Sequence, residues 1–205
     1  MKKDRIFKFA LAILLLISSI SMWNNVSRNK DQEHMKKVMI NDTYFKLNRI
    51  SCNLNRILHE IDTQATEYTT NEKKLIFLAY DFMQLHTTLK YYAMSFPLNG
   101  EFRSSYTGTI DFEHIAYTLA YGIGTVNTNS YSAILEDGSI SEDEMQYLIT
   151  LKNDIDVMIE SMTSSENPLQ ENTELTTTQL DYILNLFFDK WSYHTENSPY
   201  FLLSK

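Results

Sequence analysis

Hydrophobic residues recur at alternating intervals of three and four along residues 40–68. They fill all but two positions of the series Ile40, Thr43, Leu47, Ile50, Leu54, Ile57, Ile61, Gln64 and Tyr68. A repeat that averages 3.5 residues places all these side chains on one face of an α-helix, as in a heptad seam. The spacing therefore predicts one long amphipathic helix whose seam must be buried against something else.

A second seam with the same spacing follows almost at once. It consists of Leu75, Leu78, Phe82, Leu85, Leu89, Tyr92 and Phe96, and it stops at Pro97, which cannot continue a helix. Between the seams, Thr69 and Glu72 stand at the spacing of a capping box, which predicts a short turn there. Two long helices joined by a short turn run antiparallel, so residues 33–96 are expected to form a helical hairpin, the start of a bundle.

All five glycines of the chain fall within residues 97–140, a region rich in tyrosine. We expect a loop over residues 102–108 and then a short helix from about Thr109 to Tyr121. The predicted apolar side of this helix consists of Ile110, Ile115, Leu119 and Ile123. Gly122 and Gly124 supply the signals that end it.

Two further helices are expected in residues 141–205. The first opens with Ser141 and Glu144 as a capping box and buries Met145, Leu148, Ile155, Ile159 and Met162. The second carries Leu180, Ile183, Leu184, Phe187, Phe188 and Trp191. With 43% hydrophobic residues, the chain can build a sizeable core. The predicted fold is an all-α bundle of four to five main helices in one domain, residues 33–205, which begins with the long antiparallel hairpin.

The first 23 residues carry a different signal. Four basic side chains precede Phe9, and the run from Phe9 to Trp23 has no charge. A basic start before an apolar stretch predicts membrane insertion through residues 6–23, with the N-terminus in the cytoplasm and the domain outside. Residues 24–32 would be a short tether or the frayed start of a helix. The alternative is a signal peptide cut near Ser21, because Ser19 and Ser21 are small residues two apart, and the product would be secreted.

Charge is distributed unevenly along the chain. Residues 24–103 hold 11 Lys and Arg against 9 Asp and Glu, whereas residues 104–205 hold 3 Lys against 16 acids, and the whole chain has a net charge of −8. Nucleic acid is not expected as a partner, because phosphate binding needs a basic face. The acidic residues Glu142, Asp143 and Glu144 are a candidate docking face for a basic partner, although solvated acidic surface is also a sufficient explanation.

No pattern points to catalysis, a metal or a cofactor. The five histidines include no pair three or four residues apart, and a half-match to a calcium loop at residues 137–144 would place Ala133 and Leu135 where oxygen ligands are needed. We therefore expect a protein that is not an enzyme and holds no cofactor. The single cysteine, Cys52, is expected to be a small buried residue, with a redox or intermolecular role left open.

One segment contains several aromatic side chains that also carry a polar group. His114, Tyr117 and Tyr121 share a helix face, and Tyr106 precedes them. These four residues could line a small-ligand pocket between helices, or their rings could pack inward as core.

The sequence thus favours a membrane-tethered, non-enzymatic interaction module outside the cytoplasm. It would bind a membrane or envelope protein through the exposed side of the hairpin, the acidic half, or both. The alternative is a small-ligand-binding or sensory domain that signals through a partner. The oligomeric state stays open.

Overall fold

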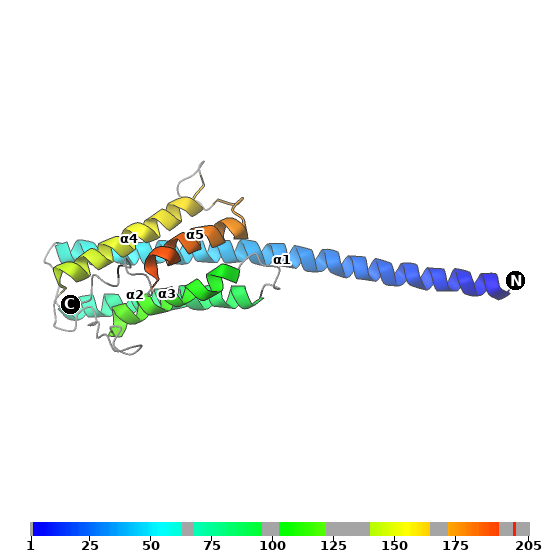
Figure 1. Ribbon diagram of the computed structural model, residues 1–205, viewed down its shortest axis with the longest axis horizontal. Coiled ribbons are helices and arrows are strands. Elements are labelled where there is room, and N and C mark those ends of the chain that lie inside the picture. Colours follow the sequence, from blue (N-terminus) through cyan, green and yellow to red (C-terminus); the bar gives the residue numbers. More distant parts are fainter. Residues whose placement is uncertain are drawn as a thin grey trace. The chain divides into compact units, whose positions relative to one another are not determined.

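The computed structural model describes residues 2–62, 68–95, 103–121, 140–164, 172–192 and 199. Side chains within the helices are described from Ser18 onward, except at residues 20, 61–62, 68–72, 95, 103–108 and 121. Five helices make up the regular structure of this part of the chain: α1 (Lys2–Asp62), α2 (Tyr68–Ser95), α3 (Arg103–Tyr121), α4 (Glu142–Met162) and α5 (Thr177–Trp191) (Figure 1). The predicted all-α class is confirmed.

The chain divides into two units, Met1–Val38 and Met39–Lys205. Residues 24–32, predicted as a tether or a frayed helix start, are helical and belong to α1. Within the part that the structure describes, no helix is both long and apolar enough to cross a membrane. Most of the predicted span, residues 6–17 and 20, lies outside the described side chains. The division into anchor, tether and domain therefore stays a prediction.

The two heptad seams form the predicted hairpin. Every described seam residue from Ile40 to Ile57 on α1, and from Leu75 to Tyr92 on α2, is buried. The helices run antiparallel, because Glu60 near the end of α1 pairs with Lys74 near the start of α2, whereas Arg49 pairs with the later Asp81. Burying a Leu, Ile or Phe side chain stabilises the folded chain by about 1.5–3 kcal/mol, so the seams dominate the energetics of the hairpin.

Aromatic rings connect α2 and α3 to the C-terminal helices. The Phe112 ring of α3 lies 6.0 Å from Phe82 of α2 and 5.2 Å from Phe187 of α5, centroid to centroid. Trp191 of α5 stacks on Phe187 at 5.5 Å and meets Tyr147 of α4 edge-on at 5.3 Å. All these rings are buried. Such pairs contribute about 0.5–1.5 kcal/mol each beyond the area they bury, and they fix α5 between α3 and α4.

Polar contacts set the positions of the helices around this core. The Ser51 hydroxyl of α1 donates to Asp156 of α4 at 2.5 Å. The Trp191 indole N–H of α5 donates to Asp154 of α4 at 2.8 Å. His86 of α2 is buried with its Nδ1 2.6 Å from the carbonyl oxygen of Thr109 in α3. A carbonyl oxygen can only accept, so this contact requires the proton on Nδ1.

Both C-terminal helices begin with a capping box. Ser141 and Glu144 exchange the predicted pair of hydrogen bonds at the start of α4, at 3.3 and 2.6 Å. Thr176 and Gln179 form a second box at the start of α5, which we did not predict. The predicted buried stripe of α5 is confirmed at all six positions.

Three local predictions were wrong. Thr69 and Glu72 lie within α2, which begins at Tyr68, so the first helix break comes before them. Residues 103–108 are the start of α3 and not a loop, which means that Gly108 is accommodated inside a helix at a cost of about 1 kcal/mol. Ile110 is 47% exposed, because the buried face of α3 is set by Phe112, Ile115 and Leu119, with which Ile110 is out of phase.

Cys52 is also not where we expected it. The side chain is exposed and its thiol is free. It lies on α1 midway between Ile50 and Leu54, both of which face the core, so the helical period carries Cys52 to the outer side.

Candidate functional site

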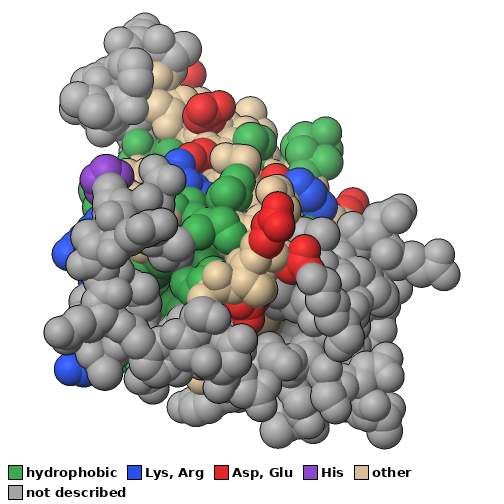
Figure 2. Space-filling view, turned by 90° about the vertical axis from the view of Figure 1, so that its left-hand side faces the viewer, with side chains coloured by type: hydrophobic (Ala, Val, Ile, Leu, Met, Phe, Trp, Pro, Cys, Tyr) green, Lys and Arg blue, Asp and Glu red, His purple; other side chains and the backbone are tan. Residues whose placement is uncertain are grey.

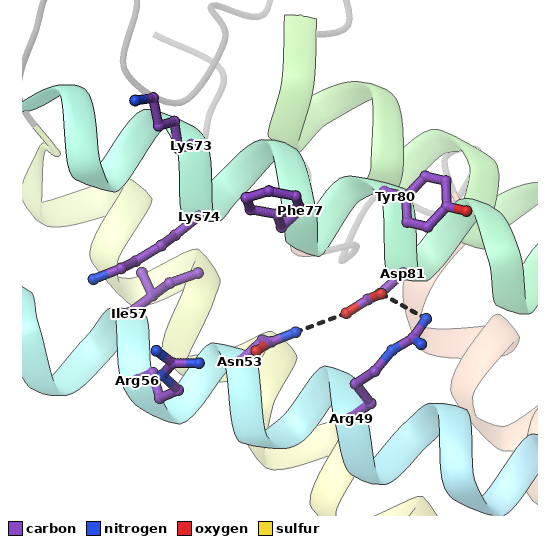
Figure 3. A pocket seen from close by; sticks show the side chains of 9 residues that line it. All are labelled: Arg49, Asn53, Arg56, Ile57, Lys73, Lys74, Phe77, Tyr80 and Asp81. Carbon is purple, nitrogen blue, oxygen red and sulfur yellow. Dashed lines mark hydrogen bonds and ion pairs between the residues drawn. The ribbon is translucent and has the colours of Figure 1, made fainter.

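A groove lies on the outer side of the hairpin, between α1 and α2 (Figure 3). Its volume is about 550 Å³, and it is open to solvent along one side. Nine residues line it: Arg49, Asn53, Arg56 and Ile57 from α1, and Lys73, Lys74, Phe77, Tyr80 and Asp81 from α2. Ligand pockets in proteins have volumes of roughly 300–1,000 Å³, so the groove is large enough to hold a bound group.

The helical period explains why these side chains line one groove. Lys73, Phe77 and Tyr80 follow one another at intervals of four and three, and Arg49 and Arg56 are one heptad apart. Neither set belongs to the buried seams. When the seams of an antiparallel pair face the core together, the side chains beside them line the outer junction between the two helices.

A buried carboxylate organises one end of the groove. The Asp81 side chain is only 8% exposed, and it accepts hydrogen bonds from Arg49 at 2.6 Å and from the Asn53 amide at 2.7 Å. The dashed lines in Figure 3 mark both contacts. A carboxylate taken out of water needs such partners, because an unpaired buried charge is costly. Asp81 thus joins α1 to α2 and holds the Arg49 guanidinium in place.

The cations at the other end are only partly neutralised. Lys74 forms an ion pair with Glu60 of α1. Arg56 and Lys73 are both exposed, and neither has an ion-pair partner among the described residues. The lining therefore pairs Arg49 and Lys74 with acids of the chain itself and leaves the charges of Arg56 and Lys73 available to a bound molecule.

Aromatic side chains form the edge of the groove on α2. Phe77 is 66% exposed and Tyr80 is 58% exposed, although both belong to a helix whose opposite face is fully buried. Tyr91 and Met94, also exposed, continue the same spacing toward the end of α2. Aromatic residues, Met and Arg are enriched in protein interfaces, so this composition is typical of a contact surface.

The candidate ligand pocket on α3 is described only in part. The side chains of Tyr106 and Tyr121 lie outside the described ones. His114 is half-buried, and Tyr117 is exposed with its hydroxyl 3.4 Å from Glu113, to which it donates. The groove on the hairpin and a smaller pocket between α4 and α5 contain neither His114 nor Tyr117. The predicted pocket stays a prediction.

The acidic residues 142–144 occupy the first turn of α4. Glu144 caps the helix, Asp143 is half-buried and Glu142 is exposed. Figure 2 views the end of the bundle at which α4 begins, and acidic side chains gather on one part of it beside exposed hydrophobic atoms. Negative charge at a helix N-terminus is favoured by the helix dipole, so a local structural role accounts for at least Glu144. A docking role of this face stays a prediction.

The smaller pocket lies on the outer side of α4 and α5. Its volume is about 90 Å³, and its apolar lining consists of Val157, Met158, Ile183, Leu186 and Phe187. Asp154 and Lys190 stand at its rim and pair with each other at 2.8 Å. Because its charges are already matched, this surface has less capacity than the hairpin groove to attract a charged partner.

No group of three or more His, Cys, Asp and Glu side chains in the described residues is placed to hold a metal ion. Sequence reasoning missed the hairpin groove, although it named the exposed side of the hairpin as a docking surface. The off-seam spacing of Lys73, Phe77 and Tyr80 places these side chains on one side of α2, but it does not show that Arg49 and Arg56 of α1 line the same groove.

Comparison with protein-family models, with curated proteins and with solved structures gives no match. The function is therefore argued from the residues of this chain alone.

Proposed function

We propose that this chain is a non-enzymatic protein-protein interaction module, tethered outside the membrane by its N-terminal segment, whose partner docks on the exposed side of the α1–α2 hairpin. The observation that carries the proposal is the surface around the groove. Phe77 and Tyr80 stand largely exposed and line the groove together with Arg56 and Lys73, two cations that have no ion-pair partner among the side chains that the structure describes. Exposed aromatic residues next to arginine are the side chains that most often provide binding energy at interfaces.

The tether is part of the proposal and rests on the sequence. The uncharged run from Phe9 to Trp23 follows four basic residues, which favours insertion with the basic end in the cytoplasm. From Ile6 to Trp23 there are 18 residues, or roughly 27 Å of helix, slightly less than the hydrocarbon core of a bilayer. The partner of such a module is a protein of the same membrane or envelope.

Chemical crosslinking in intact cells tests this function. The tagged chain is recovered from the membrane and from the medium, and the proteins attached to it are identified by mass spectrometry. We expect one recurrent partner in the membrane fraction and an intact N-terminus. A partner-free chain in the medium that lacks residues 1–21 would contradict both the tether and the interaction role.

Small-ligand binding is a second candidate function, favoured by the groove volume of about 550 Å³. A ligand that binds only the folded state raises the melting temperature, by an amount that grows with its concentration. A thermal-shift screen of anionic metabolites separates the two functions. Saturable stabilisation that is lost in an Arg56→Gln variant would favour the small ligand, and its absence would favour the protein partner.

A further inference from the structure

We infer that the groove between α1 and α2 binds an acidic segment of the partner protein, which inserts an apolar side chain beside Phe77 and places its carboxylates against Arg56 and Lys73. This inference rests on the proposed function and specifies the chemistry of the partner. Three features of the groove support it: two cations that no described acid pairs with, the apolar surface beside them, and the Asp81 end, which disfavours a further acid.

The cations that have no acid beside them in the described part of the chain determine the sign of the charge that the partner must carry. The lining contains four cations and one acid, and Glu60 neutralises Lys74 from just outside it. With Arg49 held by Asp81, Arg56 and Lys73 are left without an acid among the described residues. Opposite charge on a partner speeds its encounter and rejects partners of the wrong sign.

The apolar surface determines what else the partner must carry. Ile57 is buried in the hairpin and lines the groove between the two helices, and the exposed Phe77 ring lines the same groove from α2. In Figure 3 the Phe77 ring lies over α2, between Lys74 and Asp81, and Ile57 and Asn53 lie below it on α1. A purely polar anion would leave this surface in water, whereas a segment with an apolar side chain would bury it at about 25 cal/mol per Å².

The Asp81 end of the groove determines the orientation of the bound partner segment. The Asp81 carboxylate already accepts from Arg49 and Asn53, and a second carboxylate there would meet like charge. From Arg49 to Ile57 the groove follows eight helical steps, or roughly 12 Å, which is enough for about two turns of a bound helix. The acidic residues of the partner should therefore lie toward the Arg56 and Lys73 end, with neutral residues near Asp81.

Site-specific photocrosslinking of the full chain in its own membrane tests this inference. A benzophenone amino acid replaces Phe77 in one version and Met94, on the same face of α2 but outside the groove, in another. We expect position 77 to capture a partner peptide with net negative charge and at least one large apolar residue. The yield at position 77 should fall about tenfold when Arg56→Glu and Lys73→Glu are combined, a change equal to one order of magnitude in affinity.

The matched control is Lys90→Glu, which reverses an exposed charge on α2 away from the groove and should leave the yield unchanged. Circular dichroism melting verifies that each variant is folded. If the double Glu variant does not fold, the double Gln variant replaces it, with an expected loss of about threefold, because neutral side chains remove the attraction without adding repulsion. Changing the acids of the captured peptide to Lys should restore crosslinking to the double Glu variant.

The outcomes separate the inference from the function. Two outcomes overturn the inference but not the proposed interaction function. One is capture of a partner protein at position 94 but not at position 77, and the other is capture of a neutral or basic segment at position 77. Capture of lipid or nucleic acid at 77 also overturns the inference. Failure to capture a protein at either position contradicts both.

Discussion

Asp81 is the residue on which the outer side of the hairpin depends. Its carboxylate is buried, and it is the acceptor for both Arg49 and Asn53 across the junction between α1 and α2. Arg49 is about half exposed, so solvent screens part of this ion pair. The Asp81–Arg49 ion pair contributes mainly by giving a buried carboxylate its hydrogen-bond donors and by fixing the position of the Arg49 guanidinium, and less by Coulombic attraction.

Replacing Asp81 with Ala should lower the free energy of unfolding by about 1–2 kcal/mol, because Asn53 loses its acceptor and Arg49 its anchor. Urea denaturation measures the change. Asp189→Ala removes an exposed carboxylate of α5 as a control and should change stability by less than about 0.5 kcal/mol. Equal effects of the two substitutions would show that Asp81 has no structural role.

Tyr92 links stability to alkaline pH. Burial raises the pKa of its hydroxyl above the ordinary value of 10.0, and the nearby charges of Asp42 and Tyr91 raise the pKa further. The folded chain therefore keeps this proton to higher pH than the unfolded chain does. The resulting stability is fully present below pH 10 and is lost as pH rises through the pKa of the folded state.

Tyr92→Phe should consequently flatten the fall in melting temperature above about pH 10, and Asp42→Asn should flatten it in part. Thermal melts between pH 7 and about pH 11 measure the slope. A slope that is identical in wild type and Tyr92→Phe would mean that another group controls alkaline unfolding.

At the scale of the helix, seams could be predicted far better than boundaries. Ile40, Leu47 and Phe82 are buried as their heptad positions require, because a hydrophobic period reports directly on the face that packs. α2 and α3 begin earlier in the sequence than predicted. Thr69 and Gly108 have low helix propensity, which made a turn and a loop the expected structures, but the free energy gained by packing the rest of each helix exceeds this cost. Local helix propensity and tertiary packing thus favour different positions for the ends of these helices.

The second capping box allows a matched test of this local chemistry. Thr176→Ala should destabilise the protein by about 1 kcal/mol, because the Thr176 hydroxyl accepts from the Gln179 N–H at the start of α5. Thr178→Ala, at an exposed position two residues later, should change stability by less than about 0.5 kcal/mol. Chemical denaturation of the two variants side by side measures the difference. Loss of stability in Thr178→Ala alone would contradict the assignment of the cap.

The groove could not be predicted from either helix alone. Lys73 and Phe77 stand on one helix, and Arg56 stands on the other. Each set looks like ordinary solvated surface in the sequence. Their relation depends on how the two seams face the core together, which is a property of the packed hairpin. The candidate residues that we named, such as His114 and Glu142, were chosen from single-helix patterns and are not part of the groove.

At the scale of the whole molecule, the inner face of the hairpin is occupied. Phe82 packs on Phe112 of α3, Ser51 bonds to Asp156 of α4, and the seams are buried throughout. A partner of the hairpin must therefore use the outer face. The excess of acid in residues 104–205, 16 against 3 Lys, makes the basic hairpin groove electrostatically distinct from the C-terminal half.

The central claim is that a partner protein recognises the outer face of the hairpin. The most direct test compares two exposed apolar surfaces in one co-recovery measurement from membranes: Phe77→Ala with Tyr80→Ala on α2, and Val157→Ala with Leu186→Ala on α4 and α5. We predict that the first pair lowers partner recovery at least about tenfold, as loss of interface anchors does, and that the second pair leaves it unchanged. Loss of the partner only in the second pair, or in neither, would contradict the account.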